Sequence, residues 1–184
     1  MSTETSPSWK TLSSEEIFKH PRLTLIEDEV LLPNGQKTTY LKYKYNYSHI
    51  VTVVAQRADG KILLQQEYCY PINQKIYQFP GGKTKGTETP DQGANRELME
   101  EAQLKALDLK LLGSYLANNR RSDVRVYVYL GTKLESAALE KDAEEDTESF
   151  WYSDQEIEEL ITKGEIINVH TLAAWTLYRI IKQL

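Results

Sequence analysis

Cysteine is almost absent from this sequence, which has Cys69 alone among 184 residues. A single thiol excludes a disulfide within the chain and a metal cage built from cysteines. No apolar run approaches the roughly 20 residues of a transmembrane helix, and the opening residues, MSTETSPSWK, lack the apolar core of a signal peptide. We therefore expect a cytoplasmic protein that does not bind a membrane.

Positive charge is also scarce, because 22 Lys and Arg residues face 27 Asp and Glu residues, for a net charge of -5. This balance argues against broad attraction to a nucleic acid backbone, and we expect no nucleic acid partner. A phosphate-containing ligand would need a metal ion or a local group of basic side chains. The length suits one full-sized domain plus a small appendage.

The order of predicted elements indicates a mixed α+β protein with helices covering a sheet. The first dozen residues, through Leu12, are rich in Ser and Thr, and we expect them to be mobile. Asn34-Gly35 is a strong hairpin signal between the first two predicted strands. Strands are predicted over residues 23–32, 37–47, 49–56, 61–70, 76–82, 107–117 and 124–134, and helices over residues 89–102, 154–164 and 170–184.

An aromatic face follows the second predicted strand, where alternation places Leu41, Tyr43, Tyr45 and Tyr47 on one side. Packing against the main domain would explain this face, since aromatic residues are favoured in strands. A dimer surface or a platform for a nucleobase is the functional alternative. The residues leave these alternatives open.

The helix predicted over residues 89–102 carries an unusual group of carboxylates. Thr89, Pro90 and Gln92 form a typical helix start with a capping box. Three glutamates then stand at i, i+3 and i+4 and project from one edge of the helix: Glu97, Glu100 and Glu101. Like charges at this spacing repel each other, and a hard divalent cation with oxygen ligands would relieve the repulsion. A solvated acidic face is the alternative interpretation.

The segment before this helix favours the metal site. Gly81, Gly82 and Gly86 allow a loop to fold back over the start of the helix. Such a loop can bring backbone groups to the carboxylates or to an anion. Arg96 precedes the first glutamate, and a buried pair between Arg96 and Glu88 would hold the loop on the helix.

This segment resembles the Nudix box, the signature of the Nudix hydrolase family. The matching positions are Gly82, then after five residues Glu88, and after seven more Arg96-Glu97-Leu98, any residue, and Glu100-Glu101. Several fixed positions at the correct spacing make this a specific signal. One position departs from the pattern, because Gln103 stands where the family usually has a glycine that closes the helix.

The resemblance implies a fold, a metal and a reaction. It implies a Nudix α/β/α sandwich with a mixed sheet over residues 48–184, preceded over residues 1–47 by a flexible N-terminus and an antiparallel β-hairpin for dimerisation. It places Mg²⁺ or Mn²⁺ on Glu97, Glu100 and Glu101, with help from the Gly81 carbonyl, and makes Glu101 catalytic. Gly82, Glu88 and Arg96 would support the motif structurally.

Beyond the box, the chain is similar to the ADP-ribose pyrophosphatase branch of the family. The similarity covers the chain from about Leu23 to its end and includes KILLQQEYCYP, QFPGGK and GEIINVHTLAAW. In that branch the N-terminal strands reach across a twofold dimer and help to build both active sites. The resemblance therefore implies a homodimer, with Tyr43 and Tyr45 as candidate substrate-binding residues.

Three departures concern the contacts with substrate. The branch usually has Arg at the position of Cys69, where it contacts a phosphate. It often has Pro-Gly in the loop that here reads NNRRSD, and Arg120 and Arg121 in this loop could replace the missing contact by binding phosphate in a bidentate fork. A solvated loop is the alternative. Third, Gln66-Glu67 replaces a basic pair.

The general base of this branch is usually a glutamate in a loop between the strand after the box and the following helix. Here that loop contains DAEEDTE, and we expect the base at Glu145, or else at Glu144. No arrangement of Ser, Cys and His suggests a covalent nucleophile. The chemistry then becomes metal-assisted attack of water on phosphorus.

The leading hypothesis is an enzyme, a metal-dependent Nudix pyrophosphohydrolase. It would cut the diphosphate linkage of a nucleoside diphosphate sugar, giving a nucleoside monophosphate and a sugar phosphate. A second hypothesis is a Nudix hydrolase of another nucleotide, such as a dinucleoside polyphosphate or a nucleoside triphosphate. A third is a non-catalytic sensor with the same fold, and the three crowded glutamates argue against it.

Overall fold

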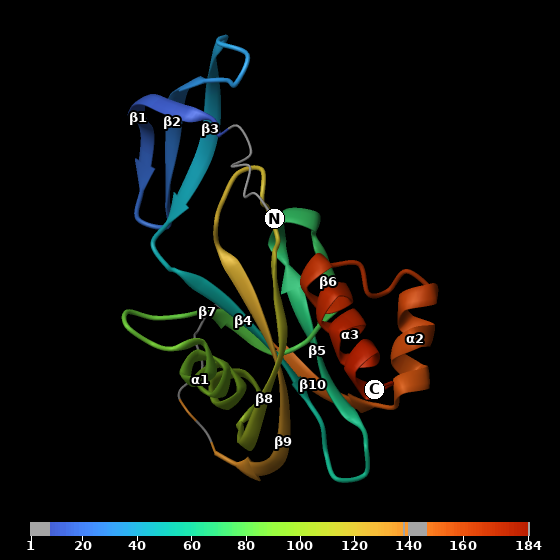
Figure 1. Ribbon diagram of the computed structural model, residues 1–184. Coiled ribbons are helices and arrows are strands. Elements are labelled where there is room, and N and C mark those ends of the chain that lie inside the picture. Colours follow the sequence, from blue (N-terminus) through green and yellow to red (C-terminus); the bar gives the residue numbers. More distant parts are fainter. Residues whose placement is uncertain (1–7, 138, 140–146, 184) are drawn as a thin grey trace, which may run out of the picture. The chain divides into compact units, whose positions relative to one another are not determined.

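Two units of unequal size make up the chain in the computed structural model, which describes residues 8–137, 139 and 147–183 (Figure 1). The first unit contains the N-terminal residues up to Asn46 together with Asn118–Val124. The second contains Tyr47–Ala117 and the residues from Arg125 onward. A hairpin loop in the second half of the sequence thus belongs to the N-terminal unit.

The first unit is an antiparallel sheet with the order β1-β2-β3, formed by Lys10–His20, Leu23–Leu31 and Lys37–Tyr45. The predicted turn between β2 and β3 is present, and Gly35 has the positive φ of 82° that suits glycine. The sequence does not predict strand β1. Lys10–Leu12 form the start of this strand, so the expected mobile segment does not extend to Leu12. The predicted mobility of residues 1–7 concerns a segment outside the described residues.

Hydrogen bonds join Asn118–Val124 to β3 within this unit. The Tyr43 amide donates to the Arg121 carbonyl at 2.6 Å, and the Arg121 guanidinium donates to the Leu41 carbonyl at 3.1 Å. The same guanidinium lies over the Tyr40 ring at 5.6 Å from its centroid. The loop therefore extends the edge of the three-stranded sheet.

The second unit contains two sheets. The mixed sheet has the order β7-β4-β9-β8, in which β4 runs parallel to β9 and antiparallel to β7. The other sheet is antiparallel with the order β10-β5-β6. Their strands are β4 His49–Ala55, β5 Ile62–Cys69, β6 Gln74–Gln78, β7 Gly81–Lys83, β8 Leu104–Leu116, β9 Arg125–Ser136 and β10 Thr147–Tyr152, with a short 3-10 helix at Tyr70–Ile72.

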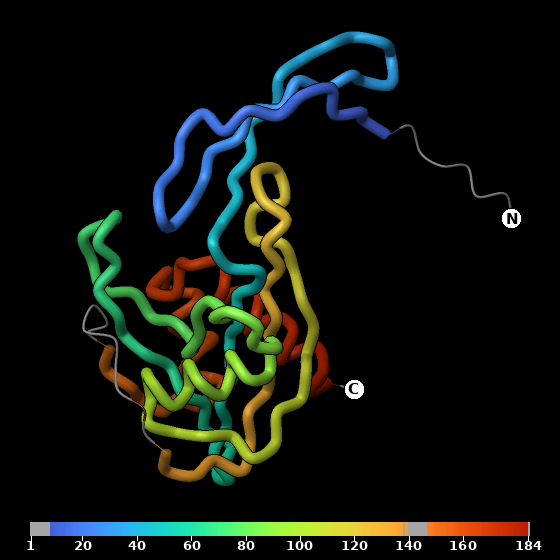
Figure 2. The backbone as a smooth tube through the Cα atoms, turned by 90° about the vertical axis from the view of Figure 1, so that its left-hand side faces the viewer, coloured from blue at the N-terminus to red at the C-terminus, as the bar shows by residue number. Residues whose placement is uncertain are grey.

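Helices lie on both sides of these strands, as both views show (Figures 1 and 2). Helix α1, Pro90–Ala102, lies on one side, and α2, Asp154–Thr162, and α3, Val169–Lys182, lie on the other. This arrangement confirms the predicted α+β class, with helices covering a sheet and a small antiparallel sheet preceding them in the sequence. Among the described helices, none combines the length and the apolar character that crossing a membrane requires.

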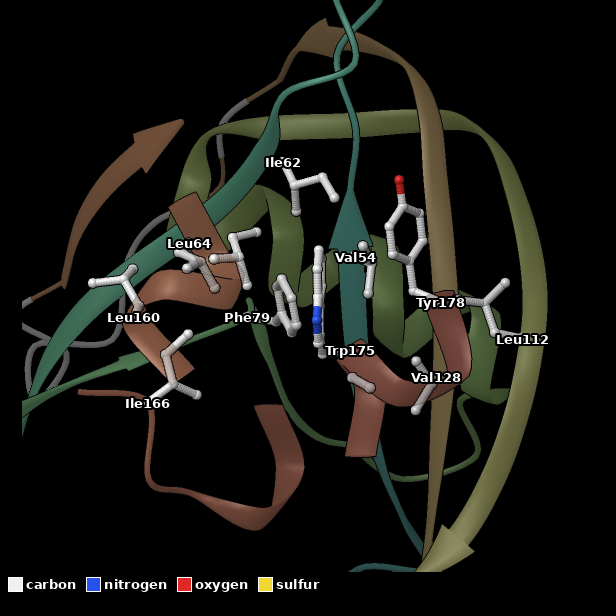
Figure 3. Close-up of a cluster of buried hydrophobic side chains, with 12 residues drawn as sticks. Val54, Ile62, Leu64, Phe79, Leu112, Val128, Leu160, Ile166, Trp175 and Tyr178 are labelled. Atoms are coloured by element: carbon white, nitrogen blue, oxygen red, sulfur yellow. The ribbon is translucent and has the colours of Figure 1, made fainter. Parts of the chain in front are cut away.

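Each side of the second unit has its own apolar cluster. Trp175 of α3 lies between Phe79 and Val54 in the larger cluster, as Figure 3 shows. In α3, Trp175 is buried, and Leu172, Leu177 and Ile181 pack partly buried against the cluster. The second cluster lies under α1 and includes Leu63, Ala94 and Leu98. Burial of Ala94 and Leu98 in this cluster holds α1 on the sheet.

Candidate active site on the glutamate helix

The start of α1 is set by local contacts that the sequence predicts. Thr89 is the N-cap with an extended backbone, and Pro90 occupies the first turn. The Gln92 side chain accepts a hydrogen bond from the Thr89 amide at 3.0 Å, so it satisfies a donor that the helix leaves open. These contacts fix where the helix begins and therefore the helical positions of the three glutamates.

Two glycines bring the chain before α1 into contact with the carboxylates. A Cβ atom on Gly82 would lie 2.5 Å from Glu97 Oε1, and one on Gly81 would lie 2.2 Å from the Val51 carbonyl oxygen. The Gly81 amide donates to Glu101 Oε2 at 3.1 Å. Because any larger residue would displace either the carboxylate or β4, glycine at both positions is a steric requirement of this site.

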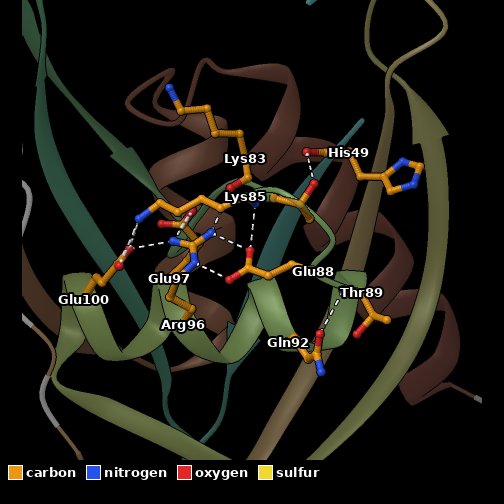
Figure 4. Close-up of polar contacts among 10 residues, drawn as sticks. His49, Lys83, Lys85, Glu88, Thr89, Gln92, Arg96, Glu97 and Glu100 are labelled. Carbon is orange, nitrogen blue, oxygen red and sulfur yellow. Dashed lines mark hydrogen bonds and ion pairs between the residues drawn. The ribbon is translucent and has the colours of Figure 1, made fainter. Parts of the chain in front are cut away.

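Arg96 lies at the centre of an ion-pair network (Figure 4). Its Nε lies 2.7 Å from Glu88 Oε1, and its Nη1 lies 2.9 Å from Glu97 Oε1 and 2.6 Å from Glu100 Oε2. The Arg96 side chain also donates to the Lys83 carbonyl at 2.8 Å. One guanidinium therefore joins the glycine loop, the helix start and two of the three motif glutamates.

The charges in this network perturb one another. Burial opposes the charge on Arg96, but the carboxylates of Glu88, Glu97 and Glu100 outweigh burial and raise its pKa further above the ordinary value. The hydrogen bond from Arg96 lowers the pKa of Glu88, with help from the Lys85 amide and against a smaller effect of burial. Both groups are therefore charged at neutral pH.

Lys85 is a site residue that sequence analysis did not single out. Its ammonium group lies 3.1 Å from Glu100 Oε1. Lys85 comes from the loop between β7 and α1, and a lysine in a glycine-containing loop carries no local signal of such a contact. Glu100 therefore faces two cations, Arg96 and Lys85, while Glu97 and Glu101 are almost completely buried.

The donor chemistry of the site fits a hard divalent cation. Carboxylate oxygens are the ligands that Mg²⁺ prefers, and Glu97 and Glu101 hold theirs beside the glycine loop with 4 % and 6 % of the residue exposed. Across the described residues, no three acidic, His or Cys side chains form a ready-made ion cage. To bind the cation, Glu100 would have to exchange contacts with Arg96 and Lys85 for it.

Helix α1 ends at the position where the family motif usually has glycine. Gln103 is the C-cap with φ 57° and ψ 34°, and its amide donates to the Leu98 carbonyl. This left-handed conformation explains the preference for glycine, which has no Cβ to clash. The departure from the motif is thus accommodated in the backbone, and the glutamates keep their spacing.

The other candidate site residues lie in the first unit or outside the described residues. Tyr43 and Tyr45 are half-buried on β3, and their rings meet edge to face at 6.2 Å between centroids. The Arg120 carbonyl accepts a hydrogen bond from the Tyr40 hydroxyl in the same unit. Glu144 and Glu145 lie outside the described residues, which resume at Thr147, the first residue of β10.

A mixed sheet between helical layers, with a glycine loop leading into a glutamate-bearing helix, defines the class of Nudix pyrophosphohydrolases. The comparisons agree, and the chain belongs to the Nudix hydrolase family: residues 47–174 match the NUDIX domain. Residues 9–40 match the nucleoside diphosphate sugar hydrolase N-terminal domain. Together the two matches make this chain a Nudix pyrophosphohydrolase, an enzyme that acts on phosphorus-containing anhydrides.

Among individual proteins similar to this chain, two ADP-ribose pyrophosphatases assign it to the ADP-ribose pyrophosphatase type of Nudix hydrolase. An ADP-ribose pyrophosphatase of Bacillus subtilis (strain 168) is 30% identical over 141 residues, which cover 77% of this chain and 74% of that protein. A methanol dehydrogenase activator of Bacillus methanolicus is 31% identical over 137 residues, covering 72% of this chain and 73% of that protein. The crystal structure of an ADP compounds hydrolase has the same fold, with a TM-score of 0.87, 20% identity, and coverage of 95% and 94%.

Proposed function

We propose that this enzyme hydrolyses the diphosphate linkage of a nucleoside diphosphate sugar of the ADP-ribose kind, giving a nucleoside monophosphate and a sugar phosphate. The observation that carries the proposal is the pair of buried carboxylates, Glu97 and Glu101, held against Gly81 and Gly82. The match of residues 9–40 to a nucleoside diphosphate sugar hydrolase domain supports the substrate class.

The divalent cation that the family generally uses would be Mg²⁺ or Mn²⁺. Glu97, Glu100 and Glu101 would hold it, with the Gly81 carbonyl as a further ligand. When bound, such a cation polarises phosphoryl oxygens, lowers the pKa of a bound water and offsets charge on the departing phosphate. Arg96 keeps Glu97 and Glu100 oriented, and the Gly81 amide orients Glu101.

A general base must take a proton from the attacking water. We assign this role to Glu145, with Glu144 as the alternative, because the resemblance to the branch implies a base in this acidic loop. The described chain resumes two residues after Glu145, at Thr147, which pairs with Glu67 of β5. Glu145→Gln should then lower kcat strongly and change KM little, since a base acts mainly in the transition state. A larger fall in kcat in Glu144→Gln would assign the role to Glu144. An unchanged kcat in both variants would show that the base does not lie in this loop.

The branch usually has an arginine that contacts phosphate at the position of Cys69, so this chain needs a phosphate contact from another residue. We assign it to Arg120 or Arg121. The Arg121 guanidinium is already positioned by the Leu41 carbonyl and the Tyr40 ring. Loss of a hydrogen bond to a charged group, about 1.5–3 kcal/mol, should raise KM about tenfold or more in the Arg120→Ala, Arg121→Ala double variant. Unchanged kinetics would show that neither arginine contacts the phosphate and that the loop is only solvated.

We propose that the N-terminal sheet forms the interface of a homodimer. In the first unit, Trp9, Ile17 and Phe18 of the β1 region are 53%, 47% and 55% exposed. Large apolar residues grouped on one small sheet favour a protein partner, and a second copy of the chain is the partner that the family resemblance indicates. Tyr43 and Tyr45 on the same sheet are the candidates for substrate contact.

The substrate class is tested by a panel of nucleotides with purified protein and Mg²⁺. ADP-ribose and other nucleoside diphosphate sugars should yield a nucleoside monophosphate and a sugar phosphate, identified by ³¹P NMR. Faster turnover of dinucleoside polyphosphates or nucleoside triphosphates would assign the enzyme to another nucleotide. Tight binding of a nucleotide without turnover of any would instead indicate a sensor.

A further inference from the structure

Strand β5 presents a second group of polar side chains that the proposed chemistry does not use. Leu63 and Trp151 belong to the apolar cluster under α1. Pairing of β5 with β6 and β10 is unbroken, so alternation puts Gln65 and Glu67 on the same face as Leu63. Gln78 and Ser149 lie directly opposite Gln65. We call these four residues the polar row: Gln65, Glu67, Gln78 and Ser149.

The polar row is linked to the glutamate helix by a short stretch of backbone. The Gln78 side-chain amide donates to Glu67. Three residues later, the Gly81 amide donates to Glu101 at 3.1 Å, and between them the Pro80 carbonyl accepts from the Val53 amide at 2.8 Å. Glu67 therefore lies one strand away from the segment that contacts the candidate metal site.

Within the polar row, acceptors outnumber donors. Gln65 is completely buried, its amide nitrogen lies 3.4 Å from Ser149 Oγ, and its Oε1 has no hydrogen-bond partner among the described residues. Glu67 is half-buried, and the described residues provide no ion-pair partner for it. Burial raises the pKa of Glu67, with the Gln78 bond as a smaller opposing effect. A ligand for this row must bring donors.

We propose that the polar row binds the hydroxyl groups of the sugar half of the substrate, with Glu67 as the specificity residue and Gln78 holding it in position. This inference rests on the proposed function. A phosphate offers acceptors and negative charge, which Glu67 would repel. A sugar offers hydroxyl donors, and two vicinal hydroxyls can donate to the two oxygens of one carboxylate.

The proposal is tested with the Glu67→Gln variant and two substrates. One is ADP-ribose, and the other is an analogue whose terminal ribose lacks its vicinal hydroxyls. The amide keeps the size of the side chain and removes the charged acceptor. Gln66→Leu is the matched control, because residue 66 points to the opposite face of β5. Thermal unfolding checks that both variants fold.

The wild type should prefer ADP-ribose over the analogue by about tenfold or more in kcat/KM, since a site built to bind a hydroxyl rejects a ligand without it. Glu67→Gln should lose this preference through a higher KM for ADP-ribose, with kcat within about twofold and the analogue unaffected. Gln66→Leu should keep the wild-type preference.

Equal losses on both substrates, a fall in kcat at constant KM, or unchanged kinetics in Glu67→Gln would each overturn the proposal. So would a preference that follows the nucleobase and not the sugar. If the wild type hydrolyses no nucleotide, the proposed function fails separately. Calorimetric titration of ADP-ribose and of its analogue without metal then tests whether the polar row binds the sugar. Equal dissociation constants of wild type and Glu67→Gln for ADP-ribose would reject this binding role.

Discussion

Arg96 neutralises more carboxylates than any other side chain around α1. Three of its ion pairs, with Glu88, Glu97 and Glu100, are 2.9 Å or shorter, and its side chain is only 13% exposed. Removing one partner of a buried ion pair leaves uncompensated charge, which costs more than the pair itself contributes. The stability of the site therefore depends on this residue before any metal binds.

Arg96→Met keeps much of the volume and removes the charge. We expect it to lower the free energy of unfolding by about 3 kcal/mol, because three carboxylates then repel each other. Urea denaturation without divalent ions measures the change. Lys163→Met is the control, since the Lys163–Glu159 pair is exposed and should contribute less than about 0.5 kcal/mol. Equal effects of the two substitutions would contradict a structural role for the network.

Glu88 gives the network a pH dependence. Its folded-state pKa lies below the ordinary value of 4.5 because Arg96 donates to its carboxylate. A carboxyl group with a lowered pKa stabilises the fold above its unfolded pKa, and this contribution is lost as the pH falls through the folded value. The stability difference between wild type and Glu88→Gln should be constant from about pH 6 to pH 8 and shrink below about pH 4.5. A difference that grows on acidification would contradict this.

At the scale of elements, the left-handed Gln103 ends α1 with a strained backbone. Replacing a left-handed residue by glycine removes the Cβ clash, about 1 kcal/mol, and the greater freedom of unfolded glycine offsets part of that gain. Gln103→Gly should therefore stabilise the protein by about 0.5 kcal/mol with unchanged kcat, measured by chemical denaturation and steady-state kinetics. Gln103→Ala keeps the Cβ and should change little. A clear loss of stability in the glycine variant would show that the Gln103 side chain has a role of its own.

The sequence predicts some elements better than others for physical reasons. Helix α1 was expected over residues 89–102 and occupies Pro90–Ala102, because its capping residues and its apolar stripe are local signals. Strand β1 was missed because KTLSSEEIFKH is mostly polar, and every residue in it is exposed. Its strand conformation comes from pairing with β2, which the local sequence does not determine.

The candidate site shows the same division. Spacing along one helix brings Glu97, Glu100 and Glu101 to one edge, and the glycine pair before the helix was also identified from sequence. The bond between Glu67 and Gln78 joins two strands, so it depends on a register that only the folded sheet sets. Lys85 reaches Glu100 across a loop, and a lysine there has no pattern that marks it.

At the scale of the whole molecule, we expect a homodimer formed through the N-terminal sheet. Sedimentation velocity at micromolar concentration should show a dimer. Ile17→Glu with Phe18→Glu should give a monomer with weaker nucleotide binding, because two charges are then placed on the apolar surface. Lys19→Glu, a charge change at a neighbouring residue of β1, should leave the dimer intact. A wild-type monomer with full activity would refute the dimer.

In the proposed mechanism, the carboxylates of α1 hold the cation that drives hydrolysis. The most direct test is kcat for ADP-ribose in the Glu101→Gln variant at saturating Mg²⁺, with folding checked by circular dichroism. The amide keeps the shape of the side chain and the hydrogen bond from the Gly81 amide, but it removes a charged ligand. Since a Lewis acid contributes several kcal/mol to such a reaction, we predict a fall in kcat by orders of magnitude with the fold unchanged. A wild-type rate in Glu101→Gln would rule out this metal site.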